Sequence, residues 1–254
     1  MPFTFSHTAA TLLFKPWLKE QKLSYTGLIL GCMAPDFEYF LRMNMQGDMG
    51  HHFIGIFLVD VPLGLILAFL IHTVIRDPFI EYLPRFLKQR FIVFQNLNGL
   101  KYLLNNFWKV VVSLILGILT HILWDAFTHK SGFVVQLSPL LQQVIHFGQF
   151  NIPVFKILQY LSGVLGLLIV MICIYKLPKH PSPNCQNEQQ HQLQRMILYW
   201  GMTLLCFIGL FGWKVQFDAI SIQSLIHYLV VGIACLFWSI LAVSLGFKVM
   251  KLKP

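Results

Sequence analysis

Two histidines and one aspartate recur at intervals of four residues in the segment HILWDAFTH. His121, Asp125 and His129 stand at positions i, i+4 and i+8. On an α-helix they fall within about 80° of one another, along roughly 12 Å of one face. The segment closes a long apolar run, where unpaired imidazole and carboxylate groups are costly. The spacing therefore indicates a further polar partner, first of all a divalent metal ion.

One ion cannot bind all three side chains, because metal–ligand bonds are only about 2 Å long. An i, i+4 pair can share an ion, so Asp125 is expected to bridge or serve two metals, with His121 on one side and His129 on the other. Imidazole and carboxylate ligands without thiolates favour zinc, and we expect one or two ions at a hydrolytic site. The open alternative is an Asp–His hydrogen-bonded pair that connects neighbouring helices.

Other histidines and carboxylates can complete the ligand shells. Asp36 follows Pro35, where we predict a break between two half-helices. Broken helices at membrane depth line polar cavities, and a carboxylate in the first turn suits the helix dipole. We interpret Asp36 as a ligand and, with Asp125, as a catalytic residue. One of His51 and His52 is expected to join the site, since neighbouring side chains differ by about 100° on a helix.

The remaining candidates have less direct positions. His7 is predicted to be a ligand if the short helix over 6–19 is re-entrant and begins near the outer side of the membrane. Four further residues are expected to line the site or to contact its ligands: Glu38, Asp60, His146 and Tyr160. Asp60 lies two turns inside a span, which favours helix packing or contact with a ligand over direct ligation.

The composition is that of an integral membrane protein. Of 254 residues, 56% are hydrophobic and only 11% are charged, with a mean hydropathy of +0.66. Soluble domains carry about 25% charged residues. The net charge of +9 does not indicate nucleic acid as a partner, because the basic residues lie in loops between apolar runs. The five cysteines show no C-x-x-C spacing and predict neither disulfides nor a thiolate metal site.

We predict an all-α, polytopic membrane helical bundle with about five to six spans. A short re-entrant or interfacial helix and a helix broken at Pro35 come first. The clear spans are 53–75, 107–128, 154–176, 196–216 and 225–247. Between two of them, 130–153 is expected to be a loop with a short helix near 140–147.

The polar, proline-rich stretch 177–195 is predicted to be a linker. It separates a site-bearing transmembrane part, 1–176, from a C-terminal transmembrane hairpin, 196–254. Basic residues alternate between the loops and end the chain, which predicts a cytoplasmic C-terminus. The same rule places the candidate ligands toward the external face. Because it makes no use of those residues, their convergence supports a single site.

Several motifs resemble those of an uncharacterised bacterial membrane-protein family, a domain of unknown function that typically opens M-P-F-T-x-S-H. The matching segments are MPFTFSH at the start, GCMAPDFEYFL from Gly31, HHFIGIF from His51, DVPLG from Asp60 and GILTHILWDAFTH from Gly117. The resemblance extends to about residue 176. It implies a bacterial inner membrane and no particular activity.

The order of these residues is also similar to that of membrane-bound metal-dependent hydrolases and of zinc-dependent phospholipase C. In those proteins an all-helical scaffold holds clustered zinc ions for phosphoester hydrolysis. The matching positions are His7, Asp36, His51 or His52, His121, Asp125 and His129. The chain departs from the pattern because Phe150, not a carboxylate, stands four residues after His146. This departure favours one or two ions over three.

Two classes of function stay open at this point. The first is a membrane-embedded hydrolase that acts on a phosphoester or lipid-linked substrate at the external interface, with the lipid bilayer as its other partner and no nucleic acid. The second is a non-enzymatic transporter or assembly factor with a polar or structural metal cluster. A transport pathway requires ionisable residues through the full depth of the membrane, and Asp60 and His72 provide only a sparse trail.

Overall fold

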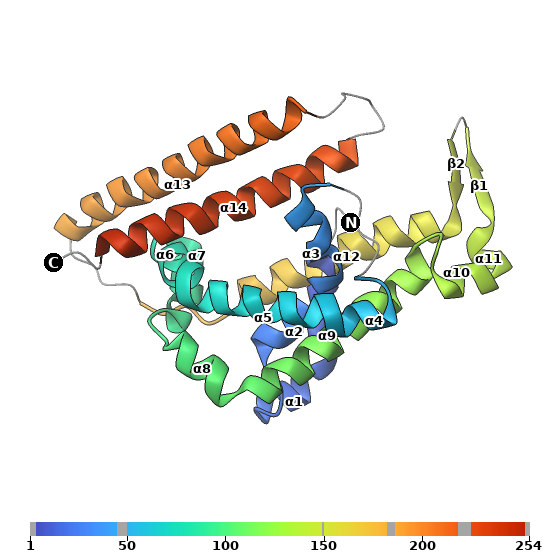
Figure 1. Cartoon of the computed structure of the whole chain (residues 1–254), viewed down its shortest axis with the longest axis horizontal. Helices are drawn as coiled ribbons and strands as arrows, with labels where there is room; N and C mark the ends of the chain where they lie inside the picture. Colours follow the sequence, from blue (N-terminus) through green and yellow to red (C-terminus); the bar gives the residue numbers. More distant parts are fainter. Residues whose placement is uncertain (1–3, 45–49, 149, 182–185, 218–224, 252–254) are drawn as a thin grey trace.

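The computed structural model describes residues 4–44, 50–148, 150–181, 186–217 and 225–251, and these are almost entirely helical (Figure 1). Among them, five helices are long and apolar enough to cross a membrane. They are Phe53–Glu81, Phe107–Leu137, Val154–Lys176, Gln192–Val215 and Ile226–Met250. The prediction of an all-α, polytopic membrane fold is therefore confirmed.

The N-terminal region supplies two short elements before the first span. A 3₁₀-helix, η1 (Thr4–Phe14), lies against α9 and α12, and α1 (Lys15–Lys19) extends it. The half-helices α2 (Tyr25–Gly31) and α3 (Ala34–Arg42) then meet at the predicted break. Asp36 lies in the first turn of α3, so the break directs its carboxylate into the bundle.

The first span contains two π-helical turns. Its segments are α4 (Phe53–Gly55), the π-turn η2 (Ile56–Asp60), α5 (Val61–Leu70), the π-turn η3 (Ile71–Ile75) and α6 (Arg76–Glu81). Pro62 follows η2 and has no N–H to donate, so the wider turn accommodates the interrupted hydrogen-bond ladder. Asp60 ends this turn and is fully buried.

The remaining elements complete the bundle. They are α7 (Arg85–Phe91), η4 (Ile92–Phe94), α8 (Gly99–Asn105), α9 (Phe107–Thr128), α10 (Phe133–Leu137), α11 (Pro139–Gln142), β1 (Val144–Phe147), β2 (Phe150–Pro153), α12 (Val154–Lys176), α13 (Gln186–Val215) and α14 (Leu225–Lys251). In Figure 1, α13 and α14 run side by side.

One local prediction is wrong. The short helix expected near 140–147 ends at Gln142, and β1 and β2 instead pair as antiparallel strands, with Val144 opposite Pro153. β-branched residues favour a strand, and Gly148 supplies the positive φ of +56° at the turn. Helix α13 begins at Gln186, within the stretch 177–195 that the composition predicts to be a linker. Its Gln- and Glu-rich start is polar but favours helix.

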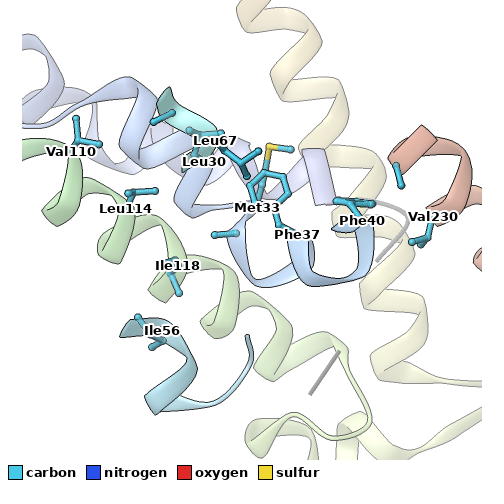
Figure 2. Close-up of a cluster of buried hydrophobic side chains, with 13 residues drawn as sticks. Leu30, Met33, Phe37, Phe40, Ile56, Leu67, Val110, Leu114, Ile118 and Val230 are labelled. Atoms are coloured by element: carbon cyan, nitrogen blue, oxygen red, sulfur yellow. The ribbon is translucent and has the colours of Figure 1, made fainter. Parts of the chain in front are cut away.

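The half-helix α2 packs against α9 through its backbone. A Cβ atom on Gly31 would lie 2.2 Å from the carbonyl oxygen of Leu114, and one on Gly117 would lie 2.5 Å from that of Leu28. Such small-residue contacts allow helices in a membrane to approach closely. Around this contact, side chains of α2, α3 and α9 form the apolar core with Val230 of α14 (Figure 2).

Replacing Gly117 by alanine tests this close contact. Alanine raises intrinsic helix propensity by about 1 kcal/mol, but here its methyl group meets backbone atoms of α2. We expect G117A to lower thermal stability in detergent, because overpacking costs about 1–3 kcal/mol. The control is G209A in α13, where a Cβ meets nothing within 4 Å. Equal or greater stability of G117A would contradict the backbone contact.

Candidate metal centre

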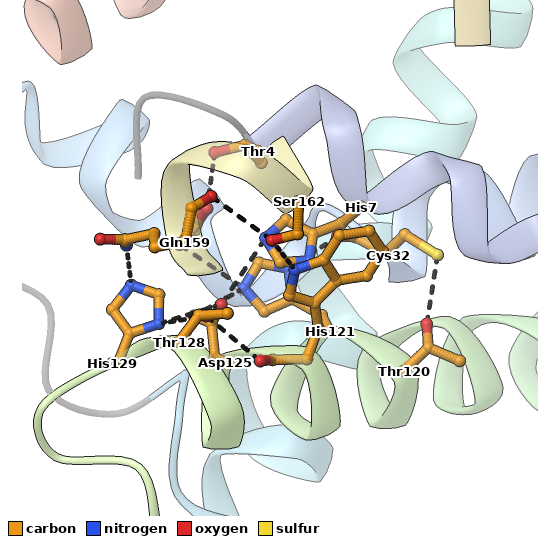
Figure 3. A network of polar contacts seen from close by, with 12 residues as sticks. Thr4, His7, Cys32, Thr120, His121, Asp125, Thr128, His129, Gln159 and Ser162 are labelled. Carbon is orange, nitrogen blue, oxygen red and sulfur yellow. Dashed lines mark hydrogen bonds and ion pairs between the residues drawn. The ribbon is translucent and has the colours of Figure 1, made fainter. Parts of the chain in front are cut away.

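Six of the predicted site residues lie together where η1, α3, α9 and the turn before α4 converge. They are His7, Asp36, His51, His121, Asp125 and His129. The close-up in Figure 3 shows four of them in the polar network beside α9. Two overlapping groups bring their ligand atoms within 4.8 Å of one another: His7, His121 and Asp125, and Asp36, His51 and His121. His121 belongs to both.

Four ligand atoms in this cluster form a closed ring. The Nε2 atom of His121 lies 3.7 Å from Asp36 Oδ1 and 3.4 Å from Asp125 Oδ2. The Nε2 atom of His51 lies 3.9 and 3.7 Å from the same two oxygens. In a tetrahedral site with bonds of about 2.0–2.2 Å, neighbouring ligand atoms are roughly 3.3–3.6 Å apart. The four sides of the ring are close to this spacing, which is what a cation shared by neighbouring pairs of these atoms requires.

The second oxygen of Asp125 faces other partners. Asp125 Oδ1 lies 3.6 Å from His7 Nε2 and 3.2 Å from His129 Nδ1. The two oxygens of one carboxylate thus point to different pairs of histidines. This is the arrangement of a carboxylate that can bridge two positions, one next to His51 and His121 and the other next to His7.

The ring nitrogens of His121 have an unusual environment. Its Nδ1–H donates a 2.7 Å hydrogen bond to the backbone carbonyl of Cys32, which fixes the tautomer and leaves the lone pair on Nε2. That buried Nε2 has no hydrogen-bond partner among the described residues, and it faces the oxygens of Asp36 and Asp125. A lone pair that faces two carboxylates is repulsive unless a cation lies between them.

A proton on His121 Nε2 does not fit the distances from this nitrogen to the two carboxylates. Nitrogen–oxygen hydrogen bonds are about 2.7–3.2 Å long, whereas His121 Nε2 is 3.4 Å or more from either carboxylate. A further buried atom of the cluster, His7 Nδ1, also has no hydrogen bond among the described residues. Buried polar atoms in folded proteins are almost always satisfied. The donor set and its spacing therefore fit a divalent metal ion.

Neighbouring groups hold two ligands in the form that binds a metal. The Thr4 hydroxyl donates a 2.5 Å hydrogen bond to Asp36 Oδ2. Burial opposes ionisation of Asp36, and this hydrogen bond favours the ionised carboxylate. Burial lowers the pKa of His7 to about 3. His7 is therefore neutral, and its ring stacks on that of His121 with centroids 4.0 Å apart.

His129 differs from the helical geometry predicted for it. Helix α9 ends at Thr128, and His129 is extended, with φ −120° and ψ 143°. Its Nε2 lies 2.6 Å from the amide nitrogen of Gln159, so it accepts a hydrogen bond there and the proton resides on Nδ1, which faces Asp125. This geometry favours His129 as a group that orients Asp125, in place of a ligand.

The structure places the other predicted residues outside the ring of ligands. His51 lies in the cluster, whereas the side chain of His52 is exposed. His146 is exposed on β1 and contacts Asn151 at 2.6 Å. Tyr160 is 43% exposed, with the Lys156 ammonium 5.4 Å from its ring centre.

Two carboxylates lie behind the cluster. Glu38 pairs with Arg42 at 2.8 Å and accepts from the backbone N–H of Gly50. Asp60 is close to the same backbone, since a Cβ on Gly50 would lie 2.9 Å from its Oδ1. Both positions adjoin the segment that carries His51.

Sequence reasoning missed Thr4 and the carbonyl of Cys32. The spacing of Thr4 and His7 could have indicated Thr4. The two residues are three apart, and residues i and i+3 share a face of a 3₁₀-helix. No pattern of side chains indicates the carbonyl of Cys32, since it depends on how α2 ends against α9.

Replacing Thr4 by valine tests the support of Asp36. T4V removes the hydroxyl without changing the shape of the side chain. We expect divalent-metal affinity to fall about 10–100-fold, as for lost hydrogen bonds to metal ligands, measured by competitive zinc titration of the purified protein. In the matched control T8V, the lost hydroxyl bonds only the backbone of Phe5, and the affinity should not change. Equal affinities in T4V and T8V would contradict this role.

Comparison with known proteins gives a family. No curated protein and no solved structure matches the chain. The model of a family described as Domain of unknown function (DUF4184) matches residues 1–245. The match continues past residue 176 and includes most of the C-terminal hairpin. The chain therefore belongs to the DUF4184 family.

Proposed function

We propose that this protein is a membrane-embedded, metal-dependent hydrolase of phosphoester or lipid-linked substrates. The observation that carries the proposal is the ring of four ligand atoms from Asp36, His51, His121 and Asp125, with sides of 3.4–3.9 Å. A structural zinc site is closed on all sides, whereas a catalytic site keeps an open position. Four protein ligands would fill a tetrahedral shell, so water would bind as a fifth ligand on the side where the His51 side chain is 30% exposed.

The donor set favours zinc over harder ions. Imidazole suits zinc and similar transition metals, whereas magnesium and calcium prefer sites made of oxygen atoms. Asp36, His51, His121 and Asp125 would hold one ion, and His7 with the second oxygen of Asp125 would contribute to another. A bound ion of this kind supplies Lewis acidity and lowers the pKa of water toward neutrality.

Residues of this chain supply charge to the site and orient the groups that would hold the ion. Asp36 and Asp125 provide negative charge on both sides of the cluster, and the backbone carbonyl of Cys32 fixes the imidazole of His121. His129 and Thr4 orient the two carboxylates, each through an oxygen that faces away from the ring. The ring of His7 and the indole of Trp124 cover the buried side, with centroids 5.1 Å apart. Substrate would approach from the side of His51 and His129.

The surroundings of this accessible side support a lipid-linked substrate. The segments that follow α9 expose large apolar side chains: Phe133 by 59%, Leu137 by 80% and Phe150 by 71%. Such residues are stable where they contact the membrane interface. With the alternation of basic loops, this supports a site at the external face of a bacterial inner membrane and a C-terminus in the cytoplasm.

One observation favours a second candidate, a transporter. Both carboxylate oxygens of Asp60 are buried in the first span without a hydrogen bond among the described residues. An ionisable group in that position is typical of proton pathways. His72, the other predicted member of such a pathway, instead bonds Thr26 at 2.9 Å and Arg76 at 3.2 Å.

The pair His51 and His52 provides a matched test of the hydrolase. We expect H51A to lose most bound divalent metal and to hydrolyse a phosphodiester amphiphile at least about 100-fold more slowly. H52A changes an exposed neighbour of the same type and should keep both properties. Metal content is measured by elemental analysis after purification without chelator, and hydrolysis in nanodiscs by release of the alcohol that leaves the phosphodiester.

Two results would contradict the hydrolase. One is a wild-type protein without bound divalent metal. The other is loss of biological function in D60N while D125N keeps it, which would favour the transporter.

A further inference from the structure

A pocket of about 680 Å³ opens beside the metal centre, where the end of α9 meets the start of α12. This volume is within the range of about 300–1,000 Å³ that small-molecule sites occupy. Its wall includes the polar or charged side chains of His129, Lys130, Ser131, Gln136, Lys156 and Gln159.

The pocket and the metal centre share a wall. His129 lines the pocket, and its Nδ1 lies 3.2 Å from Asp125 Oδ1. Gln159 lines it as well and contacts the other ring nitrogen of His129. Figure 3 shows Gln159 beside His129 and His129 beside Asp125. A molecule in the pocket is therefore separated from the bridging carboxylate by a single imidazole ring.

The charge in the pocket is positive. Lys130 and Lys156 both line it, and no aspartate or glutamate does. Neither lysine forms an ion pair with a carboxylate in the part of the chain that the structure describes. The Lys156 ammonium contacts the face of Tyr160, and its side chain is half-buried. Two lysines with neutral donors from Ser131 and Gln136 are a suitable set for phosphate oxygens.

We propose that this pocket is the binding subsite for a second phosphate group of the substrate. The inference rests on the proposed function, because the metal centre then holds the phosphoryl group that is cleaved. A diphosphate that passes the edge of His129 would place one phosphate at the metal centre and the other in the pocket. The substrate class is therefore a diphosphate, either free or attached to a lipid chain that lies along the exposed Phe133 and Leu137.

The test uses the full-length protein in zwitterionic nanodiscs and three probes that resist hydrolysis: farnesyl methylenediphosphonate, farnesyl phosphonate and methylenediphosphonate. We expect the wild type to bind the farnesyl diphosphonate at least tenfold more tightly than the farnesyl monophosphonate. The double variant K130A/K156A should lose this ratio and keep its metal. K130R/K156R and the remote, exposed control K101A should preserve the ratio.

The outcomes distinguish failure of the proposed phosphate subsite from failure of the proposed hydrolase function. An unchanged ratio in K130A/K156A, or loss of its metal, overturns the subsite, while a wild type with bound metal still supports the hydrolase. Lysine-dependent binding of methylenediphosphonate alone supports a soluble diphosphate. The same dependence seen only with the farnesyl probe supports a lipid diphosphate. If the wild type holds no metal, the hydrolase fails, and the ratio still decides the subsite.

Discussion

The lone pair on His121 Nε2 is the constraint on which the site depends. Its tautomer is fixed from behind by the carbonyl of Cys32, and in front it faces carboxylate oxygens of Asp36 and Asp125. Nothing else in the described residues satisfies this nitrogen. The distances are too long for direct hydrogen bonds and suit bonds to a common ion. Without a cation, two carboxylates and an imidazole lone pair would be buried against one another at a substantial cost in free energy.

The fold provides this geometry through backbone contact. Because Gly31 and Gly117 have no side chains, α2 approaches α9 closely enough for the last turn of α2 to present the carbonyl of Cys32 to His121. The break that follows starts α3 beside α9 and sets Asp36 opposite Asp125. The 3₁₀-helix η1 adds His7 and Thr4 from the other side. The apolar packing and the polar cluster thus depend on the same helix contact.

The sequence predicts the spans and the main cluster because both are local patterns: apolar runs of sufficient length, and ligand-type residues at a helical spacing. Loop charges, through the positive-inside rule, gave an independent reason to group Asp36 and His51 with His121 and Asp125. What could not be predicted depends on contacts distant in sequence or on where helices end. His129 leaves the helix one residue after Thr128, so its partner became Gln159. Likewise, only the packed structure distinguishes His51 from His52 and brings Lys130 to Lys156.

The central claim is that one divalent ion joins α3 and the turn before α4 to α9. An experimental structure with anomalous diffraction recorded on both sides of the zinc absorption edge tests it most directly. The account predicts a peak bonded to Asp36 Oδ1, His51 Nε2, His121 Nε2 and Asp125 Oδ2 at about 2.0–2.2 Å. A fully resolved site without an anomalous peak, in which His121 Nε2 donates a direct hydrogen bond to either carboxylate, would contradict it.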